Sequence, residues 1–220
     1  MRKKFLIPFA VMIVGTIFFV GCTSSKSNDS NSNNITNSSS TTSDKNVNEK
    51  VVQTMGIDEF EKLLAEQPLY VSSTEYFVQS QGPKILFPDM LQAIITSNST
   101  EDIKDAVVAF VAWDNNNLPV KIQNQFDFGG GSYVKQVNYK DINLVNGASY
   151  GENGGYELDE NSNISKFKAI VVSYETFDGN VWKNPYYENF KTTYEGKKYS
   201  DDMKFEVKID NNNFSEIEQS

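Results

Sequence analysis

Residues 106–113 read Ala-Val-Val-Ala-Phe-Val-Ala-Trp, and residues 114–117 read Asp-Asn-Asn-Asn. The first run is apolar at both odd and even positions, which is typical of a strand that is covered on both faces. The second run favours a turn, because Asn and Asp tolerate left-handed backbone and hydrogen-bond to their own main chain. This stretch therefore predicts a central β-strand that ends in a polar turn.

Strand signals continue on both sides of this stretch. Segments rich in β-branched and aromatic residues occupy 69–78, 90–97 and 168–177. The last of them ends at Asp178-Gly179, a strong hairpin signal. Residues 205–209 alternate apolar and polar side chains, as in a strand with one solvent-exposed face.

A single helix is predicted over residues 57–67. Ile57, Phe60, Leu63 and Leu64 recur there at helical spacing, and Pro68 disfavours continuation. Short strands separated by polar turns, together with one helix, predict a mainly β fold. The expected architecture is an antiparallel β-sandwich with one short N-terminal helix.

The N-terminus has the layout of an exported protein. Arg2, Lys3 and Lys4 precede an apolar run over 5–20, which as a helix would span about 24 Å and so falls short of a ~30 Å hydrocarbon core. The four residues 19–22, Phe-Val-Gly-Cys, resemble the lipobox of bacterial lipoproteins, with Phe where Leu is usual. This resemblance implies a signal peptide over 1–21 and acylation of Cys22 with diacylglyceryl and palmitate-type chains. An ordinary secreted protein and an uncleaved N-terminal anchor are the alternatives.

The composition divides the remaining chain into a tether and a folded part. From 23 to 50, 20 of the 28 residues are Ser, Thr or Asn. Such a segment buries too little apolar surface to offset its ordering entropy, so 22–50 is expected to be a lipidated, disordered tether. Residues 51–220 are long enough for a single domain with its own core.

The charge balance excludes some classes of partner. The chain has 20 basic and 29 acidic residues, and loss of the signal peptide removes three of the basic ones. Nucleic-acid binding needs clustered Lys and Arg, so no nucleic-acid partner is expected. The predicted partners are the lipid bilayer, through acylated Cys22, and an unidentified envelope protein or glycan. The predicted location is the outer face of the cell membrane.

Residues 91–114 resemble the FxLYD-type, immunoglobulin-like modules of bacterial envelope proteins. In those modules a strand, an Asn-containing turn and a second strand ending in aromatic-Asp form the core, and here the second strand ends in Trp113-Asp114. A longer region, from about Phe87 to Tyr199, is similar to an uncharacterised domain family of Gram-positive lipoproteins. The segments that carry this second resemblance are 118–122, 167–171, 177–179, 182–187 and 194–198. It implies an extracytoplasmic immunoglobulin-like sandwich and no established activity.

The residue inventory argues against most catalytic mechanisms. The chain has no His, and its single Cys is the predicted lipid site. Catalytic triads and thiol catalysis are therefore excluded, and we expect a protein that is not an enzyme and has no cofactor. A pair of carboxylates could still hydrolyse a glycan, with Glu152, Glu157, Asp159 and Glu160 as candidates.

Two predicted turns contain several side-chain oxygen atoms that could bind a metal ion. Residues 159–163 place such ligands at alternating positions, like the first half of a calcium loop, and the turn at 114–117 is similar. An EF-hand loop would need Gly at 164 and an acid at 170, where this chain has Ile164 and Ile170. Ordinary turn chemistry accounts for both segments, so no metal site is predicted.

The aromatic cluster of residues 182–187 is the best candidate for a ligand site. Trp182, Tyr186 and Tyr187 surround Pro185 and could form a stacking platform for a glycan or peptide. The alternative is that these rings close one end of the core. The sequence thus predicts a lipid-anchored, non-catalytic binding or scaffolding module. A carboxylate-dependent enzyme acting on cell-wall glycan and an accessory subunit of an envelope complex are the alternatives.

Overall fold

The computed structural model of the chain describes residues 51–79, 82–152 and 154–209. The predicted signal peptide, Cys22 and the predicted tether over 22–50 lie outside these residues. Among the helices that are described, none has the length and hydrophobicity of a membrane-spanning segment.

Strands dominate the described residues, and both helices are short. The elements in chain order are β1 (Val51–Met55), α1 (Ile57–Ala65), β2 (Leu69–Phe77), β3 (Met90–Ser97), β4 (Ile103–Trp113), β5 (Pro119–Val120), β6 (Lys135–Tyr139), β7 (Ser149–Tyr150), β8 (Tyr156–Glu157), β9 (Lys166–Thr176), β10 (Val181–Lys183), α2 (Tyr187–Tyr194) and β11 (Phe205–Ile209).

All strand pairs are antiparallel. The largest sheet has the order β10-β9-β4-β5, and β6 pairs with β4 beside β5. In the second sheet β3 pairs with β2 on one side and with β7 and β8 on the other. A third, two-stranded sheet joins β1 to β11. The mainly β, antiparallel fold predicted from the sequence is thereby confirmed, with β4 as the central strand.

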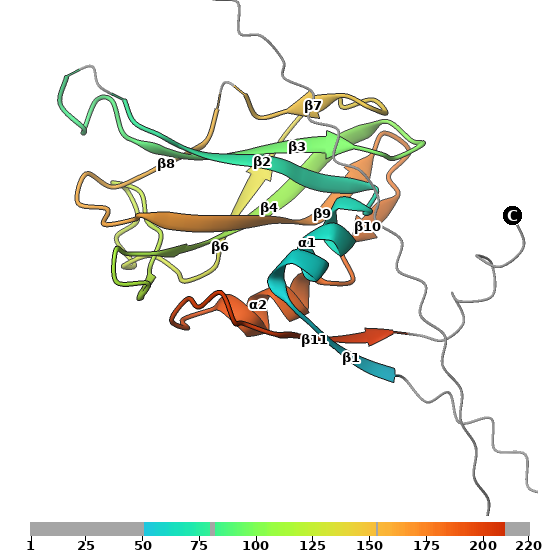
Figure 1. Ribbon diagram of the computed structural model, residues 1–220. Helices are drawn as coiled ribbons and strands as arrows, with labels where there is room; N and C mark the ends of the chain where they lie inside the picture. Colours follow the sequence, from blue (N-terminus) through green and yellow to red (C-terminus); the bar gives the residue numbers. More distant parts are fainter. Residues whose placement is uncertain (1–50, 80–81, 153, 210–220) are drawn as a thin grey trace, which may run out of the picture. The chain divides into compact units, whose positions relative to one another are not determined.

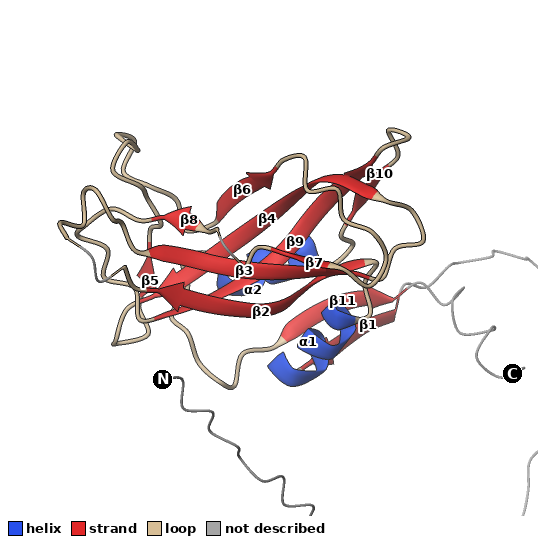
Figure 2. Cartoon of the chain, turned by 90° about the horizontal axis from the view of Figure 1, so that it is seen from above, coloured by secondary structure: helices blue, strands red, loops and turns tan. Residues whose placement is uncertain are grey.

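The elements form layers (Figure 1). The β2-β3 sheet packs against one face of the β4-β9 sheet, and Leu91, Ile95, Val108 and Phe110 are fully buried between them. We call this cluster the inter-sheet core. The other face of the β4-β9 sheet is covered by α1, α2 and the β1-β11 pair (Figures 1 and 2).

A second cluster, the helix-side core, lies between that face and the two helices. The Phe60 ring of α1 stacks on Phe205 at 3.8 Å between centroids. Trp113 meets Tyr194 and Tyr199 edge-on, and its Nε1 donates to the Lys197 carbonyl at 2.8 Å. Since side chains alternate along a strand, β4 supplies apolar residues to both cores, which explains its unbroken apolar run.

The helix prediction needs two corrections. The N-terminal helix α1 begins at Ile57 as predicted but ends at Ala65, two residues before the predicted end at 67. A second helix, α2, begins at Tyr187, so the described residues contain two short helices where the sequence predicted one. Its sequence, Tyr-Glu-Asn-Phe-Lys-Thr-Thr-Tyr, contains residues of weak helix propensity, and burial of Phe190 and Tyr194 stabilises it instead.

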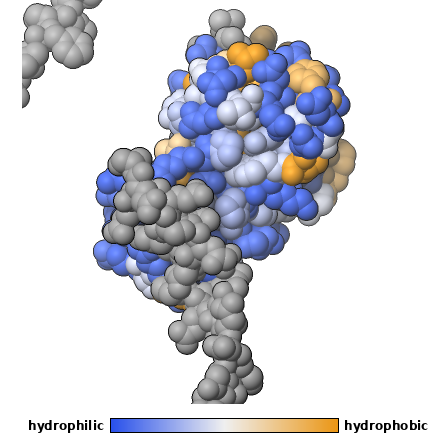
Figure 3. Space-filling model, turned by 90° about the vertical axis from the view of Figure 1, so that its right-hand side faces the viewer, coloured by the Kyte–Doolittle hydropathy of each residue, from blue (hydrophilic) through white to orange (hydrophobic). Residues whose placement is uncertain are grey.

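The two ends of this folded part differ in surface character. β1 begins and β11 ends at the same end, which faces the viewer in Figure 3; the part of it that grey atoms do not cover is mainly hydrophilic, with separate hydrophobic residues. The β2–β3 and β5–β6 loops lie at the opposite end (Figures 1 and 2). These loops expose large apolar side chains, including Leu86 (69% exposed), Phe126 (71%) and Phe128 (94%). We call them the apolar loops.

Candidate functional site

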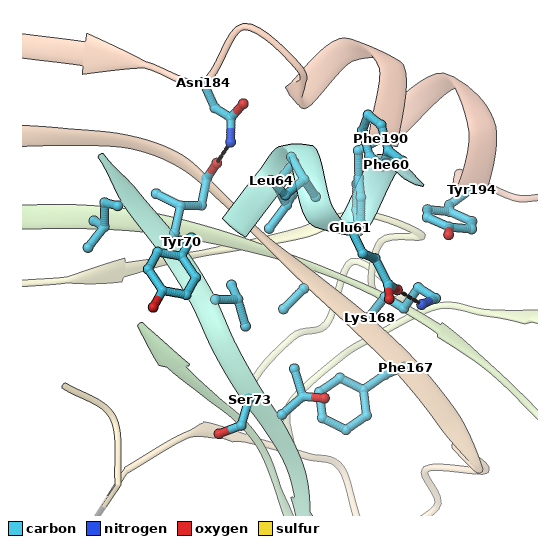
Figure 4. Close-up of a pocket in the computed structure, with 16 residues that line it drawn as sticks. Phe60, Glu61, Leu64, Tyr70, Ser73, Phe167, Lys168, Asn184, Phe190 and Tyr194 are labelled. Atoms are coloured by element: carbon cyan, nitrogen blue, oxygen red, sulfur yellow. Dashed lines mark hydrogen bonds and ion pairs between the residues drawn. The ribbon is translucent and has the colours of Figure 1, made fainter. Parts of the chain in front are cut away.

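A cavity of about 240 Å³ lies between α1, β2, β9 and α2 (Figure 4). We call it the β2–β9 groove. Leu64 of α1, Tyr70 and Ser73 of β2, and Phe167 and Lys168 of β9 are among the residues that line it. Its wall combines apolar side chains with hydroxyl groups, as in sites that bind organic ligands.

The groove exists because two strand edges meet there without pairing. β2 pairs with β3, and no other described strand pairs with its outer edge. β9 pairs with β10 only over Ser173–Glu175. Within the described residues, the outer edge of β9 between Lys166 and Ile170 therefore has no strand partner, and this edge faces the cavity.

Asn184 limits the free edge of β9 at one end. Its backbone N–H donates to the Val172 carbonyl, and its Nδ2 donates to the Val171 carbonyl, both at 2.8 Å. Asn184 is buried, so these bonds are shielded from water. The Val171 carbonyl thus points outward from the sheet. The register of β9 against β4 shifts between Val171 and Ser173, which lets the adjacent Val172 carbonyl point outward as well. Before this shift the backbone groups alternate along the strand, so those of Ala169 and Phe167 also point outward, into the groove.

The charges in the groove neutralise each other. Glu61 of α1 forms an ion pair with Lys168 of β9 in the wall of the cavity (Figure 4). Burial raises the pKa of the Tyr194 phenol above its ordinary value, with smaller contributions from Tyr199 and Glu61. Tyr194 is therefore neutral at physiological pH and presents a hydrogen-bonding hydroxyl rather than a charge.

The three aromatic residues predicted as a platform do not come together. Trp182 stacks on Tyr174 at 5.2 Å between centroids and packs against the inter-sheet core. Tyr186 lies edge-on to Phe60 at 6.3 Å, and Tyr187 accepts a hydrogen bond from Gln136 Nε2 at 2.8 Å. Both tyrosines pack against the helix-side core, on the other face of the sheet. Each ring is half-buried, and burial raises the pKa of Tyr186, with a further contribution from Glu66.

The four candidate carboxylates lie on and around β8. Glu157 is on β8, Glu152 precedes it, and Asp159 and Glu160 form the turn that follows. The three glutamates are exposed and Asp159 is half-buried. None of the four lines the β2–β9 groove. Glu152 borders a second cavity of about 440 Å³ between β6 and β7, which Tyr139 and Tyr150 also line.

The two oxygen-rich turns use their Asp side chains internally. Asp114 Oδ1 accepts from the backbone N–H groups of Asn116 and Leu118 at 2.8 and 2.9 Å. Asp159 Oδ1 accepts from the backbone N–H of Asn161 at 2.9 Å. Both are the local turn bonds typical of Asp. In the described ranges, no group of three or more Cys, Asp or Glu side chains is arranged to hold a metal ion.

No curated protein shows a significant match to the chain. Its fold is similar to the crystal structure of a hypothetical protein from Peptoclostridium difficile 630. That match has a TM-score of 0.50 and 15% sequence identity, and it covers 61% of this chain and 95% of the other. The expectation of an uncharacterised domain family is confirmed at this level: residues 90–197, from the start of β3 to just beyond α2, match DUF5780, a family of unknown function.

Proposed function

We propose that the protein is a lipid-anchored binding module on the outer face of the cell membrane, without catalytic activity. The N-terminal sequence supports the location, because its basic, apolar and Gly-Cys segments follow the order of a lipoprotein signal. Acylated Cys22 holds the protein in the bilayer, and the Ser/Thr/Asn-rich segment carries the domain away from it. The ligand is a segment of an envelope protein or a glycan.

The observation that carries the binding function is the β2–β9 groove. The backbone edges of β2 and β9 line this cavity together with apolar side chains and hydroxyl groups. The carboxylates proposed for glycan hydrolysis lie elsewhere, on the segment around β8. Binding is therefore the function that this geometry supports better than hydrolysis.

We also propose that the two facing sheets form an immunoglobulin-like sandwich of the FxLYD type. The antiparallel pairing of β4 with β9 and the burial of Trp113 at the end of β4 support this assignment. The match to DUF5780 covers the same region but names no fold type.

Cross-linking in intact cells tests the binding function. A photoreactive phenylalanine analogue replaces Tyr70, which lines the groove, in the full chain. The matched control places it at Phe177, which is exposed in the β9–β10 turn. We expect a discrete adduct from position 70 and none from position 177. Equal labelling from both positions, or no adduct from either, would show that the groove is not a binding site.

A second candidate function, an accessory subunit of an envelope complex, is supported by the apolar loops. Several of their large side chains are exposed at one end of the domain, as at many protein–protein contacts. The same photoreactive residue at Phe128 distinguishes this function, since a subunit interface would give adducts from position 128 in place of position 70.

A further inference from the structure

We propose that the β2–β9 groove binds an extended, uncharged polypeptide segment, which pairs as an added strand with the outer edge of β9 between Lys166 and Ile170. This proposal rests on the binding function above and names its ligand class. It makes the ligand a protein segment rather than a glycan.

The backbone of β9 supplies the first argument. The N–H and C=O groups of Phe167 and Ala169 point into the groove, as the outward carbonyl of Val171 requires. Another backbone in extended conformation matches the spacing of these donors and acceptors, as in peptides that add a strand to a sheet edge. Asn184 already satisfies the next two carbonyls along the same edge, which sets the end of the site.

The dimensions of the free edge suit a short segment. Five residues, Lys166 to Ile170, separate the start of β9 from the carbonyls that Asn184 occupies. A strand rises about 3.3 Å per residue, so the available edge is roughly 17 Å long. A peptide of four or five paired residues fills it.

The walls of the groove determine the side chains that fit. Leu64 and Phe167 offer apolar contacts, and Ser73 and Thr74 offer hydroxyls. Lys168 and Glu61 pair with each other, so neither is available to select a charged ligand. The preferred segment therefore alternates small apolar residues with Ser or Thr.

β9 is a better template than β2. The pairing of β2 with β3 shifts register between Val71 and Ser73, which marks a bulge in the part of β2 that borders the groove. Bulges disrupt the regular spacing of backbone groups and protect sheet edges from pairing. β2 thus forms the opposite wall and contacts the side chains of the peptide.

Binding of capped octapeptides to the full chain in detergent tests the proposal. The probes are a panel of alternating Val, Thr and Ser sequences, each made in a second form with alternate backbone nitrogens methylated. Methylation removes backbone donors and keeps every side chain. We expect the methylated forms to bind about tenfold more weakly, since each paired residue contributes hydrogen bonds. Amide exchange at Phe167 and Ala169 slows when the unmethylated peptide binds.

The matching protein variant is Ala169→Pro, which removes one outward N–H. An edge strand tolerates Pro where the N–H does not serve the sheet. Ala169→Ser keeps this N–H and is the control at the same position. We expect about a tenfold loss of peptide affinity for the first and little change for the second. The methylated peptides answer the same question if Ala169→Pro does not fold.

Three results would overturn the proposal. Equal affinity for methylated and unmethylated peptides would mean that side chains alone are recognised. Absence of peptide binding, together with a persistent adduct from position 70, would exclude strand addition and leave the binding function intact. Self-association of the chain that Ala169→Pro abolishes would show that a second copy occupies the edge.

Discussion

At the scale of single residues, Gly151 is a position where the backbone of the neighbouring strand β3 leaves no room for a side chain. It has a φ of +115°, and a Cβ atom there would lie 2.4 Å from the carbonyl oxygen of Ala93 on β3. We expect Gly151→Ala to lower the free energy of unfolding by about 2–4 kcal/mol, because it combines backbone strain with a steric clash. Chemical denaturation measures the change.

Gly147→Ala is the matched control for that substitution. Gly147 also has a positive φ, +75°, but a Cβ atom there would meet nothing within 4 Å. Its replacement should cost only about 1 kcal/mol, from backbone strain alone. Equal effects of the two substitutions would mean that β7 does not approach β3 as closely as described.

Tyr139 gives a prediction about pH. Burial raises the pKa of its phenol from 10.0 to about 12, and the neighbouring Tyr150 adds to the rise. Because the folded-state pKa exceeds the unfolded one, the protonated phenol favours the folded state below pH 10. That contribution is lost as the pH rises from about 10 to 12.

Tyr139→Phe should therefore flatten the alkaline fall in stability. We expect the loss between pH 10 and 12 to be smaller by roughly 2 kcal/mol than in the unmodified chain. Urea denaturation at several pH values measures it, with Tyr133→Phe, in the β5–β6 loop, as the control. An unchanged slope for Tyr139→Phe would mean that the phenol is solvated.

At the scale of elements, α1 depends on one aromatic contact. Phe60 is its only fully buried residue and stacks on Phe205 of β11. Phe60→Ala should lower the free energy of unfolding by about 3–5 kcal/mol through loss of this packing. The exposed Lys62→Ala on the same helix should change it by less than about 0.5 kcal/mol. Similar values for both would indicate that α1 is not packed on the sheet.

The elements also show what sequence patterns can and cannot predict. β4 and β11 are predictable because burial on two faces and on one face leaves distinct patterns, and α1 because its apolar residues recur at helical spacing. The two- and three-residue strands β5, β7, β8 and β10 are too short for any periodicity. Helix α2 was not predicted, because its residues have weak helix propensity and it begins just after Pro185, a residue more typical of a turn.

At the scale of the whole molecule, the groove could not be predicted for a different reason. α1, β2 and β9 are separated by up to about a hundred residues, and no local pattern records that two strand edges meet without pairing. The aromatic cluster 182–187 was prominent in the sequence, yet its rings lie on two faces of one sheet. Nearness along the chain does not place side chains in one site when a strand and a helix share the segment.

The location of the protein at the membrane is also a property of the whole chain, and a substitution of Cys22 tests it. Cys22→Ser should move the protein from the membrane fraction to the culture medium, because two or more acyl chains are needed for stable anchoring. Fractionation and immunoblotting measure the shift, and mass spectrometry of the unmodified protein should show an acylated N-terminal cysteine. Membrane association that survives the substitution would contradict lipid anchoring.

The antiparallel pair of β1 and β11 has a mechanical consequence. Val51, where the preceding chain enters the domain, faces Ile209 at the end of β11, and it is the first of five residue pairs along the two strands. A pull on Val51 along β1 loads all five pairs at once in shear, rather than opening them one after another. When a bound ligand pulls the domain away from the membrane, the force passes through β1, and its pairing with β11 resists that force.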